Sequence, residues 1–299
     1  MTSRFTRIGL IGRFEDARVA DSMASLARHL LDRGLGIAMD EAGESPCMPP
    51  GVQRVPLARL ADESDLIVAV GGDGTMLYAA QLAIGRSVPL LGINRGRLGF
   101  LVDVSPAEMT SSLDAVLAGD YEEDRRTLLA ARLERPDGEP ISCEALNDVV
   151  IQKLDGGRMI ELETWIGGAF VNTHGGDGLV IATSTGSTAY ALSCGGPIIH
   201  PSLDALVLAP ISPHTLSDRP IVINRDSQVE VRVASHSAAR AQVTFDGAVL
   251  GELDRESRLV VGKAANVITL IHPHGHDYFR ILRSKLHWGR SARNAASQD

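Results

Sequence analysis

Five consecutive residues carry the clearest chemical signal in this chain: Gly71, Gly72, Asp73, Gly74 and Thr75. They follow an apolar run and precede a segment with helical spacing, and a glycine-rich turn between strand and helix brings backbone N–H groups close to phosphate. A carboxylate beside phosphate is repelled unless it holds Mg²⁺ or accepts the proton of an attacking hydroxyl. The loop therefore indicates phosphoryl transfer; the alternative is a tight turn in which Asp73 caps the helix.

A second group of polar residues could hold a nucleoside. The hydroxyl-rich run from Thr183 to Ser193 contains Tyr190, so it offers N–H and hydroxyl donors together with a ring for stacking. Asn147 and Asp148 precede a predicted strand, where an amide can read a base edge and a carboxylate can accept from ribose hydroxyls. Each feature has a simpler alternative, because the run could be a turn that caps a short helix and Asn-Asp is a common turn pair.

Three histidines and an Asp-Gly pair complete the polar candidates. His272, His274 and His276 alternate in a way that could suit a metal, but proline and glycine stand between them and we favour a polar loop. Asp246-Gly247 lies between two β-like runs and is interpreted as a hairpin turn. The chain has neither a Gly-Lys-Ser/Thr phosphate loop nor a G-x-G-x-x-G fingerprint after its first strand.

The composition is that of a folded protein with an aliphatic core. Of the 299 residues, 44% are hydrophobic, 22% are charged and only 4% are aromatic. The length of the chain is typical of roughly two domains. The net charge of −8 argues against a general nucleic-acid surface. Three widely spaced cysteines favour reduced thiols, and neither a signal-peptide core nor an apolar run of about 20 residues is found. We therefore expect a cytoplasmic protein without membrane contact.

Alternating strand and helix patterns must position the phosphate loop. A helix is predicted over the spacing Val19 to Leu30, and Ser105 is expected to cap a later helix that runs to Leu117. Such a layout predicts an α/β domain with ligands at the carboxyl ends of its strands. Its strands are predicted at residues 7–11, 37–39, 66–70 and 88–93.

After about Tyr121 the pattern changes to short β-like runs separated by turns, which predicts a second, mostly β domain. We divide the chain into an α/β domain at residues 1–122 and a β-rich domain at 123–276, with a C-terminal helix in 277–299 that packs back on the first domain. The β-like runs are residues 128–133, 149–151, 160–166, 206–208, 221–223, 229–233, 243–245, 259–261 and 267–271.

Taken together and in this order, the motifs resemble the NAD kinase family over most of the chain. A single Gly-Gly-Asp-Gly-Thr is shared with diacylglycerol, sphingosine and related kinases, so the Asn-Asp pair and the Thr-Gly-Ser-Thr-Ala-Tyr run are the selective elements. The matching segments are residues 71–75, 92–94, 98–101, 146–148, 176–178, 185–193, 195–197, 213–216 and 219–220.

The resemblance implies a Rossmann-like, three-layer α/β domain followed by a β-rich, NAD-binding domain, the fold of NAD kinases and diacylglycerol kinases. It implies transfer of the ATP γ-phosphoryl group to the 2′-hydroxyl of the adenosine ribose of NAD, with Mg²⁺ or another divalent cation, by a homodimer or homotetramer. Asp73 would be the catalytic base, a Mg²⁺ contact and, with Gly74, part of the NAD site. The phosphate loop would be Gly71, Gly72, Gly74 and Thr75, and the other NAD-binding residues would be Asn147, Asp148, Arg158, Asp177, Thr188, Ala189, Tyr190, Ala191, Leu192 and Ser193.

Three positions depart from the family pattern. Ser184 stands where proline is usual, which would loosen its loop, and Ala248 stands where many bacterial members carry glutamine. Gly175 replaces an arginine of some NAD-restricted members, and we hypothesise that its absence relaxes discrimination against NADH. The sequence leaves open whether ATP or polyphosphate is the donor.

Two other functions remain open at this point. A lipid or other small-molecule kinase could share the glycine-rich motif, but the Asn-Asp pair and the hydroxyl-rich run would then have no evident role. A non-catalytic module that senses NAD or NADP would have no need of Asp73 beside phosphate.

Overall fold

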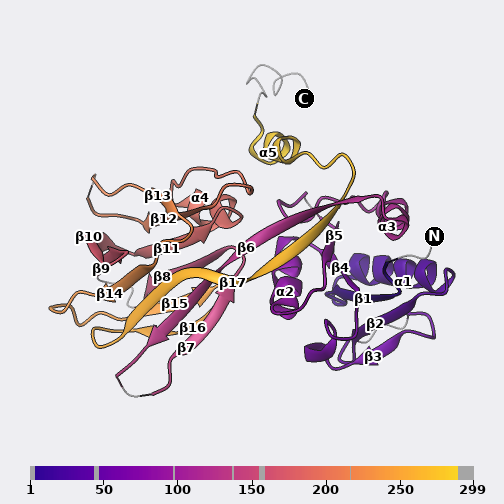
Figure 1. Ribbon diagram of the computed structural model, residues 1–299, viewed down its shortest axis with the longest axis horizontal. Coiled ribbons are helices and arrows are strands. Elements are labelled where there is room, and N and C mark those ends of the chain that lie inside the picture. The colour runs from indigo at the N-terminus through magenta and orange to yellow at the C-terminus, as the bar shows by residue number, and fades with distance from the viewer. Residues whose placement is uncertain are drawn as a thin grey trace. The chain divides into compact units, whose positions relative to one another are not determined.

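The computed structural model describes residues 4–43, 47–96, 98–136, 138–154, 159–215 and 217–288 (Figure 1). The chain forms two compact units, one of residues 1–125 with 269–299 and the other of residues 126–268. Two long strands, β6 (Tyr121–Glu134) and β17 (Arg258–Pro273), each carry the chain from one unit into the other. Within the described ranges, no helix is both long and apolar enough to cross a membrane.

The first unit contains a parallel sheet in the order β17-β5-β4-β1-β2-β3. The chain leaves β1 toward one edge and later returns to β4, on the other side of β1, so the strand order reverses between β1 and β4. In open α/β sheets, ligands bind outside the carboxyl ends of the strands at such a reversal. The strands are β1 (Arg7–Gly12), β2 (Gly36–Asp40), β3 (Gln53–Val55), β4 (Leu66–Gly71) and β5 (Leu90–Asn94).

Helices cover both faces of this sheet and make three layers. Val68 and Val70 of β4 share a core with buried residues of α1 and α3, whereas Met76 of α2 lies against the opposite face at Gly92. Alternate residues of a strand point to opposite faces, so a strand buried on both sides is apolar throughout. The helices are α1 (Ala17–Leu31), α2 (Asp73–Ala83), α3 (Met109–Ala118) and α5 (Tyr278–Leu286), with a short 3-10 helix, η1 (Leu57–Arg59).

The predicted strands and helices of the first unit are confirmed, with two differences. The short strand β3 lies in a stretch for which no strand was predicted, and only its last residue, Val55, is buried. The helix expected after Ser105 begins later, at Met109, with Glu108 as the N-cap. The prediction of Ser105 as the cap is therefore wrong; its hydroxyl instead donates to the Glu108 carboxylate at 2.6 Å.

The second unit is built from two sheets that share one apolar core. One sheet is six-stranded and antiparallel in the order β13-β12-β11-β8-β15-β16, and the other contains β10, β9, β14, β17, β6 and β7. Alternate strand residues of both sheets point into the core, and a smaller cluster covers the outer face of the six-stranded sheet. The remaining strands are β7 (Ile141–Ala145), β8 (Asp148–Lys153), β9 (Ile160–Ile166), β10 (Ala169–Gly176), β11 (Gly178–Thr183), β12 (Ala205–Ile211), β13 (Ile221–Asn224), β14 (Val229–Val233), β15 (Ala241–Phe245) and β16 (Ala248–Leu253).

Every β-like run predicted after residue 121 lies in a strand, so the β-rich interpretation is confirmed. The runs 259–261 and 267–271 are parts of the single strand β17. Four strands in the described part of the second unit were not predicted, namely β7, β10, β11 and β16.

Candidate active site

The glycine-rich loop joins β4 to α2. Gly71 ends β4, Gly72 is the N-cap of α2 and Asp73 is its first residue, so the alternative in which Asp73 caps the helix is wrong. None of Gly71, Gly72 and Gly74 has a positive φ. Space is the reason for glycine: a Cβ at Gly71 would lie 2.2 Å from the Thr75 hydroxyl, while Gly72 and Gly74 leave backbone open to solvent.

The Asp73 carboxylate is held by the segment that follows β5. Phe100 N–H donates to Oδ2 at 2.9 Å and Leu101 N–H donates to Oδ1 at 3.0 Å. Gly99 permits this approach, because a Cβ there would lie only 1.9 Å from Oδ1. Hydrogen bonds from backbone N–H groups to a carboxylate favour its ionised form and fix its orientation. Asp73 is thus a half-buried, oriented acceptor at the N-terminus of a helix.

A pocket of about 360 Å³ lies at the carboxyl ends of β1, β4 and β5, where the strand order reverses. Its walls include Gly71, Gly72, Gly74 and Thr75 of the loop together with three arginines, Arg13, Arg18 and Arg95. The Nε atom of Arg95 is buried without a hydrogen-bond partner in the described structure. Backbone N–H groups, a helix N-terminus and guanidinium groups in one pocket provide a site for phosphate.

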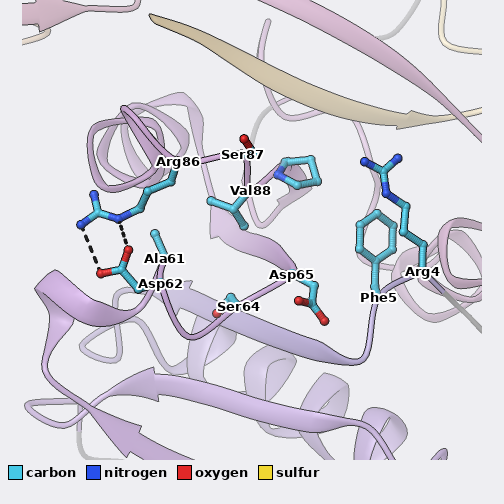
Figure 2. A pocket seen from close by; sticks show the side chains of 10 residues that line it. Arg4, Phe5, Ala61, Asp62, Ser64, Asp65, Arg86, Ser87 and Val88 are labelled. Carbon is cyan, nitrogen blue, oxygen red and sulfur yellow. Dashed lines mark hydrogen bonds and ion pairs between the residues drawn. The ribbon is translucent and has the colours of Figure 1, made fainter.

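A second pocket of the first unit, about 440 Å³, lies at the amino ends of the strands (Figure 2). Its charged groups are already paired: the Arg86 guanidinium donates to both oxygens of Asp62, at 2.5 and 3.3 Å. Asp65 accepts from the backbone N–H groups of Thr6 and Arg7. Because its charges are matched within the protein and it lies away from the glycine-rich loop, this pocket is not the candidate site.

In the second unit, Asn147 and Asp148 are held by Asp246. The Asp246 carboxylate accepts the backbone N–H groups of Leu146 and Asn147, both at 2.7 Å, and of Asp148 at 3.2 Å. The predicted hairpin turn is confirmed, since Asp246 (φ +45°) and Gly247 (φ +85°) connect β15 to β16. The sequence interpretation missed the role of the Asp246 side chain.

Asp148 is buried on the outer face of the six-stranded sheet. Burial, followed by the nearby charge of Asp246, raises the pKa of Asp148 to about 7, and a hydrogen bond from the Tyr190 backbone N–H opposes that rise. The Tyr190 contact also shows that the hydroxyl-rich run lies beside Asp148. This carboxyl group therefore exchanges its proton near neutral pH.

The hydroxyl-rich run folds into a tight turn against the Asn-Asp pair. It contains a 3-10 helix, η2 (Gly186–Thr188), and a single helical turn, α4 (Tyr190–Ser193). A Cβ at Gly186 would lie 2.1 Å from the Asn147 carbonyl oxygen, and Thr183 N–H donates to that oxygen at 2.9 Å. Ala191 is fully buried in the cluster on this face, whereas Tyr190 is 37% exposed, which leaves it available for stacking. The structure thus brings Asn147, Asp148 and residues 188–193 together.

The remaining predicted residues have different surroundings. Asp177 lies in the turn between β10 and β11, where its carboxylate pairs with the Lys153 ammonium group at 2.6 Å, which lowers the pKa of Asp177. Ser184, a departure from the family pattern, donates its hydroxyl to the Leu203 carbonyl at 2.5 Å and so anchors its loop. Arg158 lies outside the described residues.

The C-terminal histidines differ from the polar loop that we predicted. His272 lies in β17 and is buried, and both it and His276 contact the Asp103 carboxylate. Only His274 is largely exposed, and it pairs with Asp120 and Glu122. The loop interpretation is therefore wrong for His272, because β17 extends beyond the apolar run.

Comparisons with known proteins agree with this geometry. Residues 8–121 match the family model of the ATP-NAD kinase N-terminal domain, and residues 146–272 match that of the ATP-NAD kinase C-terminal domain. The NAD kinase of Methylococcus capsulatus is 46% identical over 288 residues, which cover 96% of this chain and 99% of that protein. The NAD kinase of Nitrosococcus oceani is 43% identical, with 97% and 99% coverage.

Two solved structures share the fold. A crystal structure of yeast NADH kinase complexed with NADH has a TM-score of 0.87 at 23% identity and covers 97% of this chain and 92% of that chain. A crystal structure of an NAD kinase from Archaeoglobus fulgidus in complex with ATP has a TM-score of 0.70 at 25% identity, with 94% and 98% coverage.

Proposed function

Because the chain belongs to the NAD kinase family, we propose that it transfers the γ-phosphoryl group of ATP to the 2′-hydroxyl of the adenosine ribose of NAD, which yields NADP. The observation that carries this proposal is the oriented Asp73 carboxylate, which stands between Gly72 and Gly74, two residues that line the arginine-rich pocket.

Asp73 accepts the proton of the 2′-hydroxyl group while the oxygen of that hydroxyl attacks the γ-phosphorus of ATP. The bond between that phosphorus and the oxygen bridging to the β-phosphate breaks, and ADP leaves. Each carboxylate oxygen accepts one backbone N–H, which leaves further lone pairs for the hydroxyl. A positioned base of this kind contributes about 10²–10⁴-fold to the rate.

The arginine-rich pocket supplies charge neutralisation, which is the main requirement of phosphoryl transfer. Arg13 and Arg95, with the N–H groups of Gly72 and Gly74, would bind the phosphates of ATP. Arg18 is already bound to Asp16 at 2.9 Å and so contributes less.

Asn147 and Asp148 would hold the adenosine part of NAD through its base and ribose hydroxyls, and the Tyr190 ring would stack on the base. Thr188 to Ser193 would surround the same group, and Asp177 would anchor the nicotinamide end. The proposed adenosine site is supported by the contacts that bring Asn147, Asp148 and residues 188–193 together in the second unit. Asp177 is not part of these contacts and lies in the turn between β10 and β11. Arg158 remains a predicted contact of the dinucleotide.

Mg²⁺ is the proposed cofactor, and it would neutralise charge on the transferring phosphoryl group. The pocket fits a cation held mainly by phosphate oxygens, because its described walls contain three arginines and only one carboxylate, Asp16, which is paired with Arg18. Asp73 has acceptor capacity left and would be the protein contact.

Purified protein incubated with ATP, Mg²⁺ and NAD tests the function directly. NADP formation, detected with an NADP-specific dehydrogenase, is the expected result. Replacing NAD by diacylglycerol or sphingosine tests a lipid kinase, and replacing ATP by polyphosphate tests the donor. A protein that binds NAD without forming NADP would be the non-catalytic sensor and would contradict the proposal.

We also propose a cytoplasmic homodimer or homotetramer that associates through the β-rich unit. Exposed apolar side chains on two edge strands of this unit, Phe170 of β10 and Val222 of β13, support this proposal. Light scattering after size exclusion gives the mass, and a monomer would contradict the assignment.

A further inference from the structure

A buried cluster consists of Asp103, which follows the segment that holds Asp73, together with His272 and His276. Asp103 Oδ2 accepts from His272 Nδ1 at 3.1 Å and from His276 Nδ1 at 2.5 Å. The side chains of Asp103, His272 and His276 are 9%, 3% and 14% exposed. Two residues from the C-terminal end of the chain are thus tied to a carboxylate that follows β5.

The cluster lies very close, along the chain, to the donors of the Asp73 carboxylate. Asp103 is two residues after Leu101, whose N–H group donates to Asp73. Beyond Asp103, the segment is fixed to the sheet by Asn94 N–H, which donates to the Val104 carbonyl at 2.8 Å. The Asp103 side chain is therefore an anchor between the sheet and the two N–H groups that orient Asp73.

The contacts within the cluster are those of a charged hydrogen-bonded group. Burial disfavours the charged ring of His272, but the hydrogen bond to Asp103 and the carboxylate of Asp124, 3.7 Å from Nε2, outweigh it and raise the pKa of His272 to about 9. The rings of His272 and His276 stack with centroids 3.8 Å apart and an interplanar angle of 25°. Both imidazole Nδ1 atoms bond to the same Asp103 oxygen, so the three side chains form one hydrogen-bonded cluster.

We propose that Asp103, held by His272 and His276, is a positioning residue that fixes the Phe100 and Leu101 N–H groups and, through them, the Asp73 carboxylate. This inference rests on the proposed role of Asp73. A buried carboxylate bonded to a charged partner is costly to displace, so it holds a short segment more firmly than exposed contacts do.

The variants Asp103→Asn and His276→Gln test the proposal, with His274→Gln as the matched control. His274 belongs to the same segment but bonds Glu122 and Asp120 and does not contact Asp103. We expect kcat to fall by about 10-fold or more in the first two variants, because small displacements of a catalytic group are costly. The KM for ATP and the KM for NAD should change by less than about 3-fold in a protein with native circular dichroism, since only the base is displaced.

A double-mutant cycle separates positioning from a general structural effect. In an Asp73→Asn background, where the oriented base is gone, the Asp103→Asn change should lower the residual rate by less than about 2-fold. Residual turnover is measured by transfer of a radiolabelled γ-phosphoryl group. If Asp103→Asn does not fold, His276→Gln completes the same cycle.

An equal loss in both backgrounds, or a kcat within about 2-fold of wild type in folded Asp103→Asn and His276→Gln, would overturn the proposal. Near wild-type turnover in Asp73→Asn alone would instead refute the proposed role of Asp73. The two failures are therefore distinguishable in one set of assays.

Discussion

Substituting Gly99 by alanine would disturb the Asp73 carboxylate with little change elsewhere. Gly99 is buried and immediately precedes the two N–H groups that hold Asp73. An added Cβ would lie 1.9 Å from Oδ1 and 2.8 Å from Cγ of Asp73, and no other group is among its nearest neighbours. The carboxylate is the end of a flexible side chain, so it can retreat while the backbone stays in place.

The distances set the size of the effect. To reach ordinary van der Waals contact, the carboxylate oxygen must move by roughly 1.5 Å, which breaks at least one of its two backbone hydrogen bonds. A misplacement of about 1 Å costs on the order of 10²-fold in rate, so we expect kcat to fall about 100-fold in Gly99→Ala. The N–H groups left without an acceptor should lower the free energy of unfolding by only about 1–3 kcal/mol.

The assay is steady-state NADP formation, with thermal unfolding of the same preparations. Gly36→Ala is the matched control, because a Cβ at Gly36 would have its nearest neighbour at 3.4 Å, an ordinary contact. We expect the control to retain wild-type kcat. A folded Gly99→Ala protein whose kcat is within about 3-fold of wild type would refute the reasoning.

Three further predictions concern substrate binding. NAD affinity should weaken as the pH falls through about 7, because protonated Asp148 is a weaker acceptor for ribose hydroxyls than the carboxylate. The Asp246→Asn change should move this midpoint to lower pH, because it removes a nearby negative charge. Calorimetric titration with NAD across pH measures both, and a midpoint that does not move contradicts the role of Asp246. The Arg95→Met change should raise the KM for ATP by about 10-fold, because it removes a guanidinium group from the phosphate pocket. The control Arg86→Met lies in the other pocket and should leave this KM unchanged. Equal effects of the two variants would argue against the phosphate site. The wild-type protein should phosphorylate NADH detectably. The Gly175→Arg variant, whose new side chain has room beside Met159, should lower the rate with NADH relative to the rate with NAD. Absence of NADH phosphorylation by the wild type would refute the hypothesis.

Most strands that are continuous apolar runs were predictable from the sequence, although the fully buried strand β11 was missed and the largely exposed strand β13 was found. The strands β1 and β4 are continuous apolar runs because helices cover both faces of their sheet. In contrast, most residues of β10 are exposed or half-buried, and apolar and polar residues do not alternate along it, so the segment gave no strand pattern. The strand β17 was divided in two because Gly262 and Lys263 interrupt its apolar pattern.

The candidate site was predictable where residue type alone limits the chemistry. Asp73 between glycines indicates phosphate chemistry whatever the fold, and residues 185–190 indicate a nucleoside site. Its supporting contacts could not be predicted, because the donors to Asp73 are backbone N–H groups that almost any residue carries. Arg95 is an ordinary surface residue by type, and only the strand order places it beside the loop.

The most direct test of the central claim is turnover of Asp73→Asn measured together with its affinity for NAD. The substitution keeps the size of the side chain and removes the base, so kcat should fall by about 10²–10⁴-fold while the fold and the dissociation constant for NAD stay near wild type. Near wild-type NADP formation by a folded Asp73→Asn protein would contradict the account.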